Sequence, residues 1–169
     1  IDMRKANFSS LHEYGSTMFG EANTWEEFIS KFTNSKHIIN SKYIRQVILG
    51  NCNPKRHITY EKYLMDQTLS LLLDLFDEKN IVFFSNDEII FDVTAENDLS
   101  QLIHLKDRVA DQLNTKSKIP FRVELFSLHK INGTDGYYKK IYRENGDYGI
   151  DFKCLNNYMI PFVFRLFLS

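Results

Sequence analysis

The chain has 169 residues and a formal net charge of −1, with 43% hydrophobic and 14% aromatic residues. This composition is typical of a folded domain with a sizeable core, and it excludes a disordered chain. The sequence has no apolar run of about eighteen residues and no signal-peptide pattern, so we expect neither a membrane span nor secretion.

The ends and the cysteines give two further expectations. Apolar Ile1 runs straight into Asp2, like a strand cut at its edge, so we expect a piece of a larger protein. Cys52 and Cys154 lie far apart and lack zinc-type spacing. They predict free thiols in a reducing compartment, cytoplasmic or nuclear, with a disulfide as the less favoured alternative.

The first half of the chain predicts helices after a short strand that ends over residues 1–3. Residues 25–32 (WEEFISKF) have apolar side chains at helical spacing, and Thr24 before them is a favoured N-cap residue. The other predictions here are a helix over 42–49 that ends at Gly50, a turn-rich segment over 51–56 and a long helix over 59–76.

The second half begins with a predicted hairpin over 81–93 (IVFFSNDEIIFDV), in which two apolar runs flank a polar tip at Ser85 to Glu88. The remaining predictions are a helix over 97–113, strands over 121–129, 137–142 and 150–155, and an apolar tail over 158–167 that fits helix or strand. This order predicts an α+β fold, with helices packed on one face of an antiparallel sheet.

Acidic residues fall at the end of the first strand and at the tip of the hairpin. Asp2, Asp87 and Glu88 can meet if these strands pair, and carboxylate oxygens are the ligands that Mg²⁺ prefers. Two such ions can activate an attacking hydroxyl and stabilise a leaving pyrophosphate. Turn chemistry is the alternative explanation, because Asp and Asn are favoured in tight turns for local reasons.

Basic residues are concentrated between residues 36 and 62, where Glu61 is the only acid. Such a segment can attract phosphate within a chain that is neutral overall. A solvated helix face is the alternative. The basic residues are Lys36, Lys42, Arg45, Lys55, Arg56 and Lys62.

Four segments, in this order, resemble the palm domain of template-directed nucleic-acid polymerases, mainly family B DNA polymerases with reverse-transcriptase-like features. The first, IDMRKANFSSL, resembles motif A, and the second, SKYIRQVILGNCNPKR, resembles the motif B helix of the fingers. The hairpin resembles motif C, and GYYKKIYRENG resembles the Lys-Lys-x-Tyr segment that follows it.

The resemblance implies roles for the residues of motifs A and C. Asp2 takes the metal-ligand position, and Asn7 stands where an aromatic residue usually packs under the incoming sugar. Either Phe8 takes over that contact or sugar discrimination is relaxed. Motif C usually carries Asp-Thr-Asp or Asp-Asp, so here Asp87 would bind metal and Glu88 would assist it as catalytic residue and ligand.

The other two segments imply contacts with phosphate and base. Lys42 and Arg45 would face the triphosphate and Asn51 the nascent base pair, although the Tyr-Gly of motif B is absent. The residues expected to contact nucleic acid are Lys55, Arg56, Lys139, Lys140 and Tyr142.

The sequence therefore predicts a DNA or RNA polymerase that extends a primer with nucleoside triphosphates, using two Mg²⁺ ions or Mn²⁺ in their place. We expect one palm-like domain over 1–169 with part of the fingers at about 10–60, a primer-template partner, and further polymerase domains or subunits. A compact, divergent polymerase favours a virus or mobile element as the source, and DNA replication as the process.

Two alternatives remain open. Glu88 and Asn7 depart from the polymerase pattern, which fits a nucleic-acid-binding module without catalysis. The aromatic tail NNYMIPFVFRLFLS fits a structural domain whose apolar end packs in a larger assembly.

Overall fold

The structure, a computed structural model, describes all residues except 53, 96, 97 and 169, and leaves out the side chains of 54, 55 and 166–168. Helices and small antiparallel sheets are both present, so the predicted α+β class is confirmed. Two compact units divide the chain: unit 1 comprises Ile1–Asp98 and Asp107–Val123, and unit 2 comprises Leu99–Lys106 and Glu124–Ser169. The expectation of one palm-like domain with part of the fingers stays a prediction.

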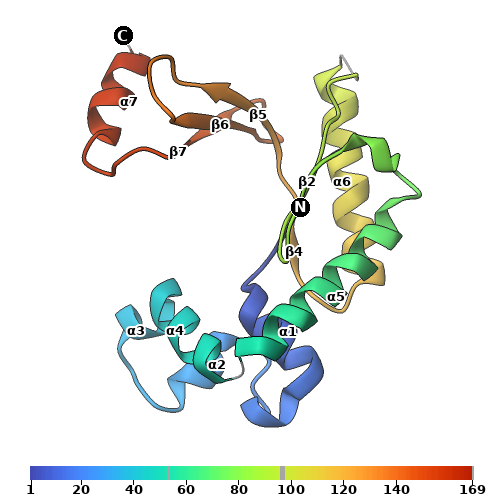
Figure 1. Cartoon of the computed structure of the whole chain (residues 1–169), viewed down its shortest axis with the longest axis vertical. Helices are drawn as coiled ribbons and strands as arrows, with labels where there is room; N and C mark the ends of the chain where they lie inside the picture. Colours follow the sequence, from blue (N-terminus) through green and yellow to red (C-terminus); the bar gives the residue numbers. More distant parts are fainter. Residues whose placement is uncertain (53, 96–97, 169) are drawn as a thin grey trace. The chain divides into compact units, whose positions relative to one another are not determined.

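Helices form most of the first part of unit 1 (Figure 1). They are α1 (Ala6–Gly15), the 3₁₀ helix η1 (Ser16–Phe19), α2 (Trp25–Ser30), α3 (Lys36–Asn40), α4 (Lys42–Cys52), α5 (Pro54–Leu72) and the 3₁₀ helix η2 (Glu78–Asn80). The predicted cap of α2 is confirmed, since Thr24 Oγ1 accepts a hydrogen bond from Glu27 N at 3.1 Å. A later helix, α6 (Leu99–Lys116), has residues in both units.

The predicted helix end at Gly50 and the turn after it are wrong. The α4 helix continues through Gly50 to Cys52, and α5 begins at Pro54. Glycine inside a helix costs only about 1 kcal/mol, and proline is well tolerated in the first helical turn, so neither residue prevents this arrangement. Asn53 lies outside the described residues.

The core of unit 1 packs around Trp25, which is 0% exposed. Its indole Nε1 donates to Ile39 O at 3.0 Å, and this bond ties α3 to α2. Each such buried apolar side chain stabilises the fold by roughly 1.5–3 kcal/mol. The buried cluster comprises Phe8, Leu11, Phe19, Ala22, Trp25, Ile29 and Leu49.

The strands of unit 1 bring distant parts of the chain together. Strand β1 (Asp2–Met3) pairs antiparallel with β4 (Phe121–Arg122), and β2 (Ile81–Phe84) pairs with β3 (Ile89–Phe91), which confirms the hairpin. An antiparallel bridge between Asp2 and Glu88 joins the two pairs. The predicted strand over 121–129 is divided, because β5 begins only at Leu125.

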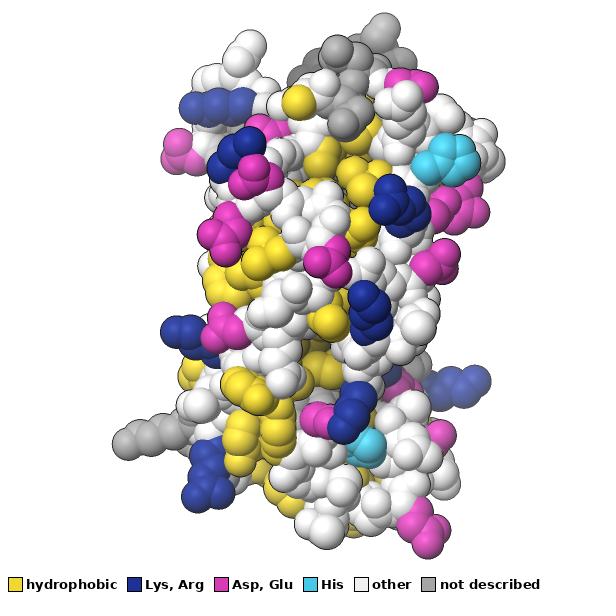
Figure 2. All heavy atoms as spheres, turned by 90° about the vertical axis from the view of Figure 1, so that its right-hand side faces the viewer, with side chains coloured by type: hydrophobic (Ala, Val, Ile, Leu, Met, Phe, Trp, Pro, Cys, Tyr) yellow, Lys and Arg dark blue, Asp and Glu magenta, His cyan; other side chains and the backbone are white. Residues whose placement is uncertain are grey.

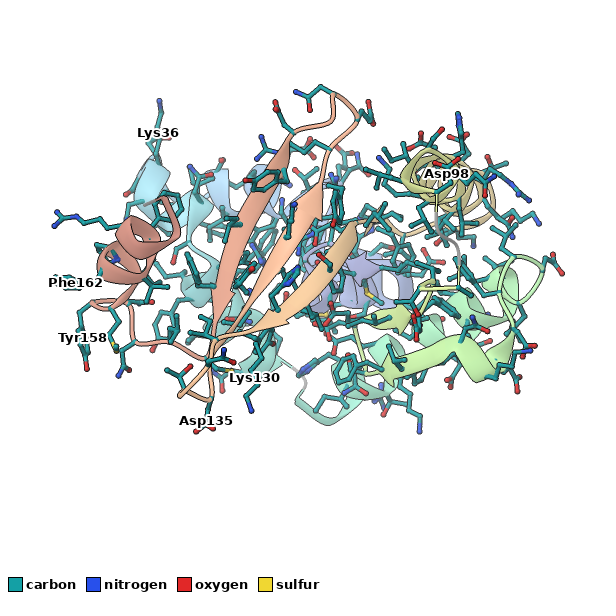
Figure 3. The ribbon with its side chains drawn as sticks, turned by 90° about the horizontal axis from the view of Figure 1, so that it is seen from above. Lys36, Asp98, Lys130, Asp135, Tyr158 and Phe162 are labelled. Carbon is teal, nitrogen blue, oxygen red and sulfur yellow. The ribbon has the colours of Figure 1, made fainter. Side chains whose placement is uncertain are left out.

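Unit 2 contains a three-stranded antiparallel sheet in the order β5 (Leu125–Lys130), β6 (Tyr137–Tyr142) and β7 (Tyr148–Lys153). The apolar tail is a helix, α7 (Ile160–Leu168), whose Phe164 contacts Phe152 of the sheet. Figure 3 shows the three strands side by side and labels Tyr158 and Phe162, which are 71% and 64% exposed.

The surface mixes apolar and charged side chains. Figure 2 shows one face on which hydrophobic side chains lie between scattered acidic and basic ones. Both cysteines are free and exposed. Over the described residues, the length and apolar character needed to cross a membrane are not combined in any helix.

Candidate carboxylate site

The hairpin tip is built around the Ser85 hydroxyl. Its Oγ accepts hydrogen bonds from the backbone N–H of Asp87 at 3.4 Å and of Glu88 at 3.0 Å, and donates to Asp87 Oδ1 at 3.0 Å. Ser85 N also donates to Glu88 O at 2.9 Å and closes the turn. Local turn chemistry therefore accounts for part of the polar tip, as one of the two sequence interpretations expects.

Beside this turn, Asp2 lies directly opposite Glu88. Met3 N donates to Asp87 O at 2.8 Å and Ile89 N donates to Ile1 O at 2.9 Å, one bond on each side of the pair. Asp2 and Glu88 thus form a non-hydrogen-bonded pair, the type in which opposing Cα atoms are about 4.5 Å apart and side chains share a face. The structure brings these two predicted site residues together.

The two faces of this small sheet differ in character. Met3, Ile89 and Phe121 are 2%, 0% and 8% exposed and form the buried face. Because side chains alternate along a strand, Asp2 and Glu88 belong to the opposite face. Asp2 is the register partner of Arg122, so the three charged residues form one row across β4, β1 and the hairpin.

An ion pair balances part of this negative charge. Arg122 Nη2 donates to Asp2 Oδ2 at 2.9 Å, and the two side chains are 54% and 32% exposed. Carboxylates directly opposite each other destabilise a strand pair, so the guanidinium offsets their repulsion. A pair this exposed contributes no more than about 1 kcal/mol.

Asp87 acts on a different carboxylate, that of Glu61. Glu61 lies on α5 and is only 9% exposed. Burial, and secondarily the charge of Asp87, raise the pKa of Glu61 to about 7. The two acids of the hairpin therefore have different partners: Glu88 lies opposite Asp2, and Asp87 interacts with Glu61. The one available sequence signal for Glu61 was its helical phase, which it shares with buried Leu64 and Thr68.

The donor chemistry of this site suits a hard divalent cation. Mg²⁺ is usually held by one or two carboxylates together with waters and substrate phosphates, so Asp2 and Glu88 on one face fit it. In the part of the chain that the structure describes, no group of three or more His, Cys, Asp or Glu side chains is placed to hold a metal. Asp87 is therefore not seen as a third ligand.

Comparison with family models, curated proteins and solved structures finds no match to this chain. The resemblance to a polymerase palm thus stays a prediction. The feature of the structure that fits such a site is the Asp2–Glu88 pair.

The two residues predicted to contact the sugar differ in burial. Phe8 is 4% exposed, and its ring centroid lies 4.8 Å from that of Phe19 in the core. Asn7 is partly exposed, and its Oδ1 accepts from Phe8 N at 3.0 Å. Only Asn7 of these two residues presents side-chain surface to solvent.

The predicted triphosphate contacts on α4 differ in burial. Lys42 is exposed, whereas Arg45 is 9% exposed and its Nε has no hydrogen-bond partner among the described residues. Burial lowers the pKa of Arg45, and the nearby charge of Glu26 opposes that change. Glu26 also forms an ion pair with Lys5. Asn51, predicted to lie near the base pair, is exposed and donates to Val47 O at 2.7 Å.

The predicted nucleic-acid contacts on β6 lie on opposite faces of the sheet. Lys139 Nζ lies 4.3 Å from the Phe126 ring centroid, whereas Lys140 Nζ lies 4.3 Å from that of Tyr148 and 5.5 Å from that of Tyr142. As neighbours on β6, the two lysines point to opposite faces of the sheet, and only Lys140 shares a face with Tyr142.

In unit 1, Arg56 is exposed on α5. The side chain of Lys55, another predicted nucleic-acid contact, lies outside the described residues.

Proposed function

We propose that the chain is a template-directed nucleotidyltransferase of the polymerase-palm type, which extends a primer with nucleoside triphosphates. The observation that supports this most is the pairing of Asp2 with Glu88. A strand-end acid beside an acidic hairpin is the arrangement that the resemblance to motifs A and C requires.

In this proposal Asp2 and Glu88 would hold Mg²⁺. When bound, Mg²⁺ would supply the positive charge that activates the primer hydroxyl and stabilises the leaving pyrophosphate. Arg122 is a positioning residue, because its bond to Oδ2 fixes the orientation of the Asp2 carboxylate. Asp87 has the smaller role in this version, since its Oδ1 accepts from Ser85 and shapes the turn.

The chain's basic residues would bind the substrates. Lys42 is exposed at the start of α4 and would neutralise triphosphate oxygens by charge-assisted hydrogen bonds. Lys140 and Tyr142 share a sheet face in unit 2 and would contact the primer-template backbone. Asn7 would face the sugar, which leaves discrimination against ribonucleotides without an aromatic ring at that position.

Primer extension tests this function. We expect Mg²⁺-dependent extension by the parent chain, and a loss of at least about a hundredfold in Asp2→Asn and in Glu88→Gln, because each removes a carboxylate ligand. Asp87→Asn should lose less extension activity than either of these variants. Asp66→Asn, which alters an exposed acid on α5, is the matched control. Full activity in Asp2→Asn, with the fold intact by circular dichroism, would contradict the proposal.

The ion pair between Arg122 and Asp2 favours a second candidate, a nucleic-acid-binding module without catalysis. The guanidinium occupies Asp2 Oδ2, which a metal would otherwise use. This candidate predicts salt-dependent oligonucleotide binding that is unchanged by Mg²⁺ or by Asp2→Asn, and no extension by the parent chain.

A further inference from the structure

Three tyrosines from two helices form a surface cluster on unit 1. The ring centroids of Tyr14 (α1) and Tyr60 (α5) are 4.6 Å apart, and Tyr63 meets Tyr14 edge-on at 6.1 Å. Tyr60 packs against the buried core, which fixes the base of the cluster. Tyr14 and Tyr63 are 41% and 52% exposed. This tyrosine cluster (Tyr14, Tyr60 and Tyr63) therefore presents aromatic surface to solvent while its base packs against the core.

Helix α5 extends the cluster with polar groups. Arg56, Tyr60, Tyr63 and Gln67 are spaced i, i+4, i+7 and i+11, so they lie along one side of the helix. Gln67 Nε2 donates to the Tyr63 hydroxyl at 3.1 Å and holds that ring in place. Arg56 is exposed one turn before Tyr60. Arg56, the partly buried ring of Tyr60 and the exposed ring of Tyr63 thus follow one another along α5.

The exposed charged residues nearest this row on α5 are Arg56, one turn before Tyr60, and Asp66, one turn after Tyr63. Glu61, the only acid between residues 36 and 62, is buried on the opposite side of α5. Between residues 36 and 62 the charged side chains described as exposed are all basic, and of those on α5 Arg56 shares the side of the row whereas Lys62 does not. The acid before Tyr14, Glu13, is paired with Lys118 at 3.3 Å, and the next acid along α5 is Asp66.

We propose that the tyrosine cluster and Arg56 bind single-stranded nucleic acid. Bases would stack on Tyr14 and Tyr63, and Arg56 would contact a backbone phosphate. Exposed aromatic rings beside positive charge are how proteins bind unpaired strands, because every base has a face to stack and the backbone is anionic. In a duplex both faces of a base are already stacked, so the cluster should favour a single strand.

This inference rests on the proposed function in taking nucleic acid as the partner, and it would give the unpaired template strand a site on unit 1. The competing explanation is that the rings only pack α1 against α5. Packing accounts well for Tyr60, which contacts the core. It accounts less well for Tyr63, half of whose surface is exposed while its hydroxyl is held in place by Gln67.

Fluorescence anisotropy with a labelled oligothymidine and a labelled duplex of equal length, without Mg²⁺, provides the test. We expect Tyr63→Ala to raise the Kd for the single strand roughly five- to hundredfold, as expected for loss of one stacked base. Tyr63→Phe keeps the ring and should stay within about twofold of the parent chain. Arg56→Gln should reduce the slope of log Kd against log salt by about 0.7.

Tyr158→Ala is the matched control, because Tyr158 is an exposed tyrosine of unit 2 outside the cluster. The inference is overturned if Tyr63→Ala binds the single strand as the parent does, if Tyr158→Ala weakens binding equally, or if the parent binds the duplex as tightly.

Primer extension by the same variants separates this inference from the function. If primer extension requires Asp2 but not Tyr63, the binding site at the tyrosine cluster is contradicted and the polymerase function is supported. If single-strand binding requires Tyr63 but the parent chain does not extend a primer, the binding site is supported and the polymerase function is contradicted.

Discussion

Asp2 and Glu88 oppose each other as a non-hydrogen-bonded pair between β1 and the hairpin tip, although 85 other residues separate them in the sequence. Two carboxylates in this relation repel each other, which destabilises the strand pair unless a nearby cation compensates part of the charge. Arg122 supplies part of that compensation through Asp2. The proposed metal would supply it more completely.

The first prediction concerns this balance of charge. Arg122→Gln should lower the free energy of unfolding by about 1 kcal/mol, because the Asp2 carboxylate then faces Glu88 without its guanidinium partner. Urea denaturation measures the change. The double variant Arg122→Gln, Glu88→Gln should recover most of the loss, since the repulsion is gone. An equal loss in both variants would contradict the predicted repulsion.

The second prediction is a pH dependence caused by Glu61. Its pKa in the folded chain is about 7, above the ordinary 4.5, so the folded state binds more protons between these values. Stability should therefore fall as pH rises from about 4.5 to 7, and level off above that range. Glu61→Gln should flatten the profile and stabilise the chain at pH 8 by up to about 3 kcal/mol. Thermal unfolding across pH measures this, and Glu78→Gln, at an exposed acid, should leave the profile unchanged.

The third prediction concerns the buried guanidinium of Arg45. Glu26 provides a counter-charge for both Arg45 and Lys5. Glu26→Gln should destabilise the chain by about 2 kcal/mol, less than for a fully buried pair because Glu26 is partly exposed. Adding Arg45→Met should restore stability, as the uncompensated charge is then absent. Glu21→Gln, at an exposed acid, is the control in the same denaturation experiment.

The fourth prediction uses the two neighbouring lysines of β6 as their own control. If the face bearing Tyr142 contacts the primer-template, Lys140→Gln should weaken binding and reduce its salt slope by about 0.9 for duplex DNA. Lys139→Gln should change neither, because its side chain lies over Phe126 on the other face. Equal effects of both substitutions on binding would exclude a one-sided contact.

Locally encoded features were predictable from the sequence. Two such features are the helix capped by Thr24 and the hairpin over 81–93. Each depends on residues that are close together in the sequence, so the sequence pattern predicts it. Neither α1 nor α3 was predicted. The short α3 is stabilised by a hydrogen bond from outside the helix, which Trp25 donates to Ile39 O.

Site residues were harder to predict because their placement depends on tertiary contacts. The sequence grouped Asp2, Asp87 and Glu88, but adjacent residues differ in direction, and the structure places Glu88 opposite Asp2 while Asp87 affects Glu61. Likewise, the sequence is compatible with Phe8 either contacting the sugar or packing in the core, and only the tertiary packing distinguishes the two. The opposite directions of Lys139 and Lys140, by contrast, can be predicted from the sequence, because successive side chains of a strand point to opposite faces.

The bond between Arg122 and Asp2 also bears on the order of folding. It joins residues 120 positions apart, and β1 has no partner strand until either the hairpin or β4 reaches it. Closing so long a loop costs entropy before any contact repays it, so we expect the row of charges to assemble late, after the local helices have formed. During synthesis Asp2 would emerge from the ribosome 120 residues before Arg122, so the candidate site would be completed only after β4 has been made.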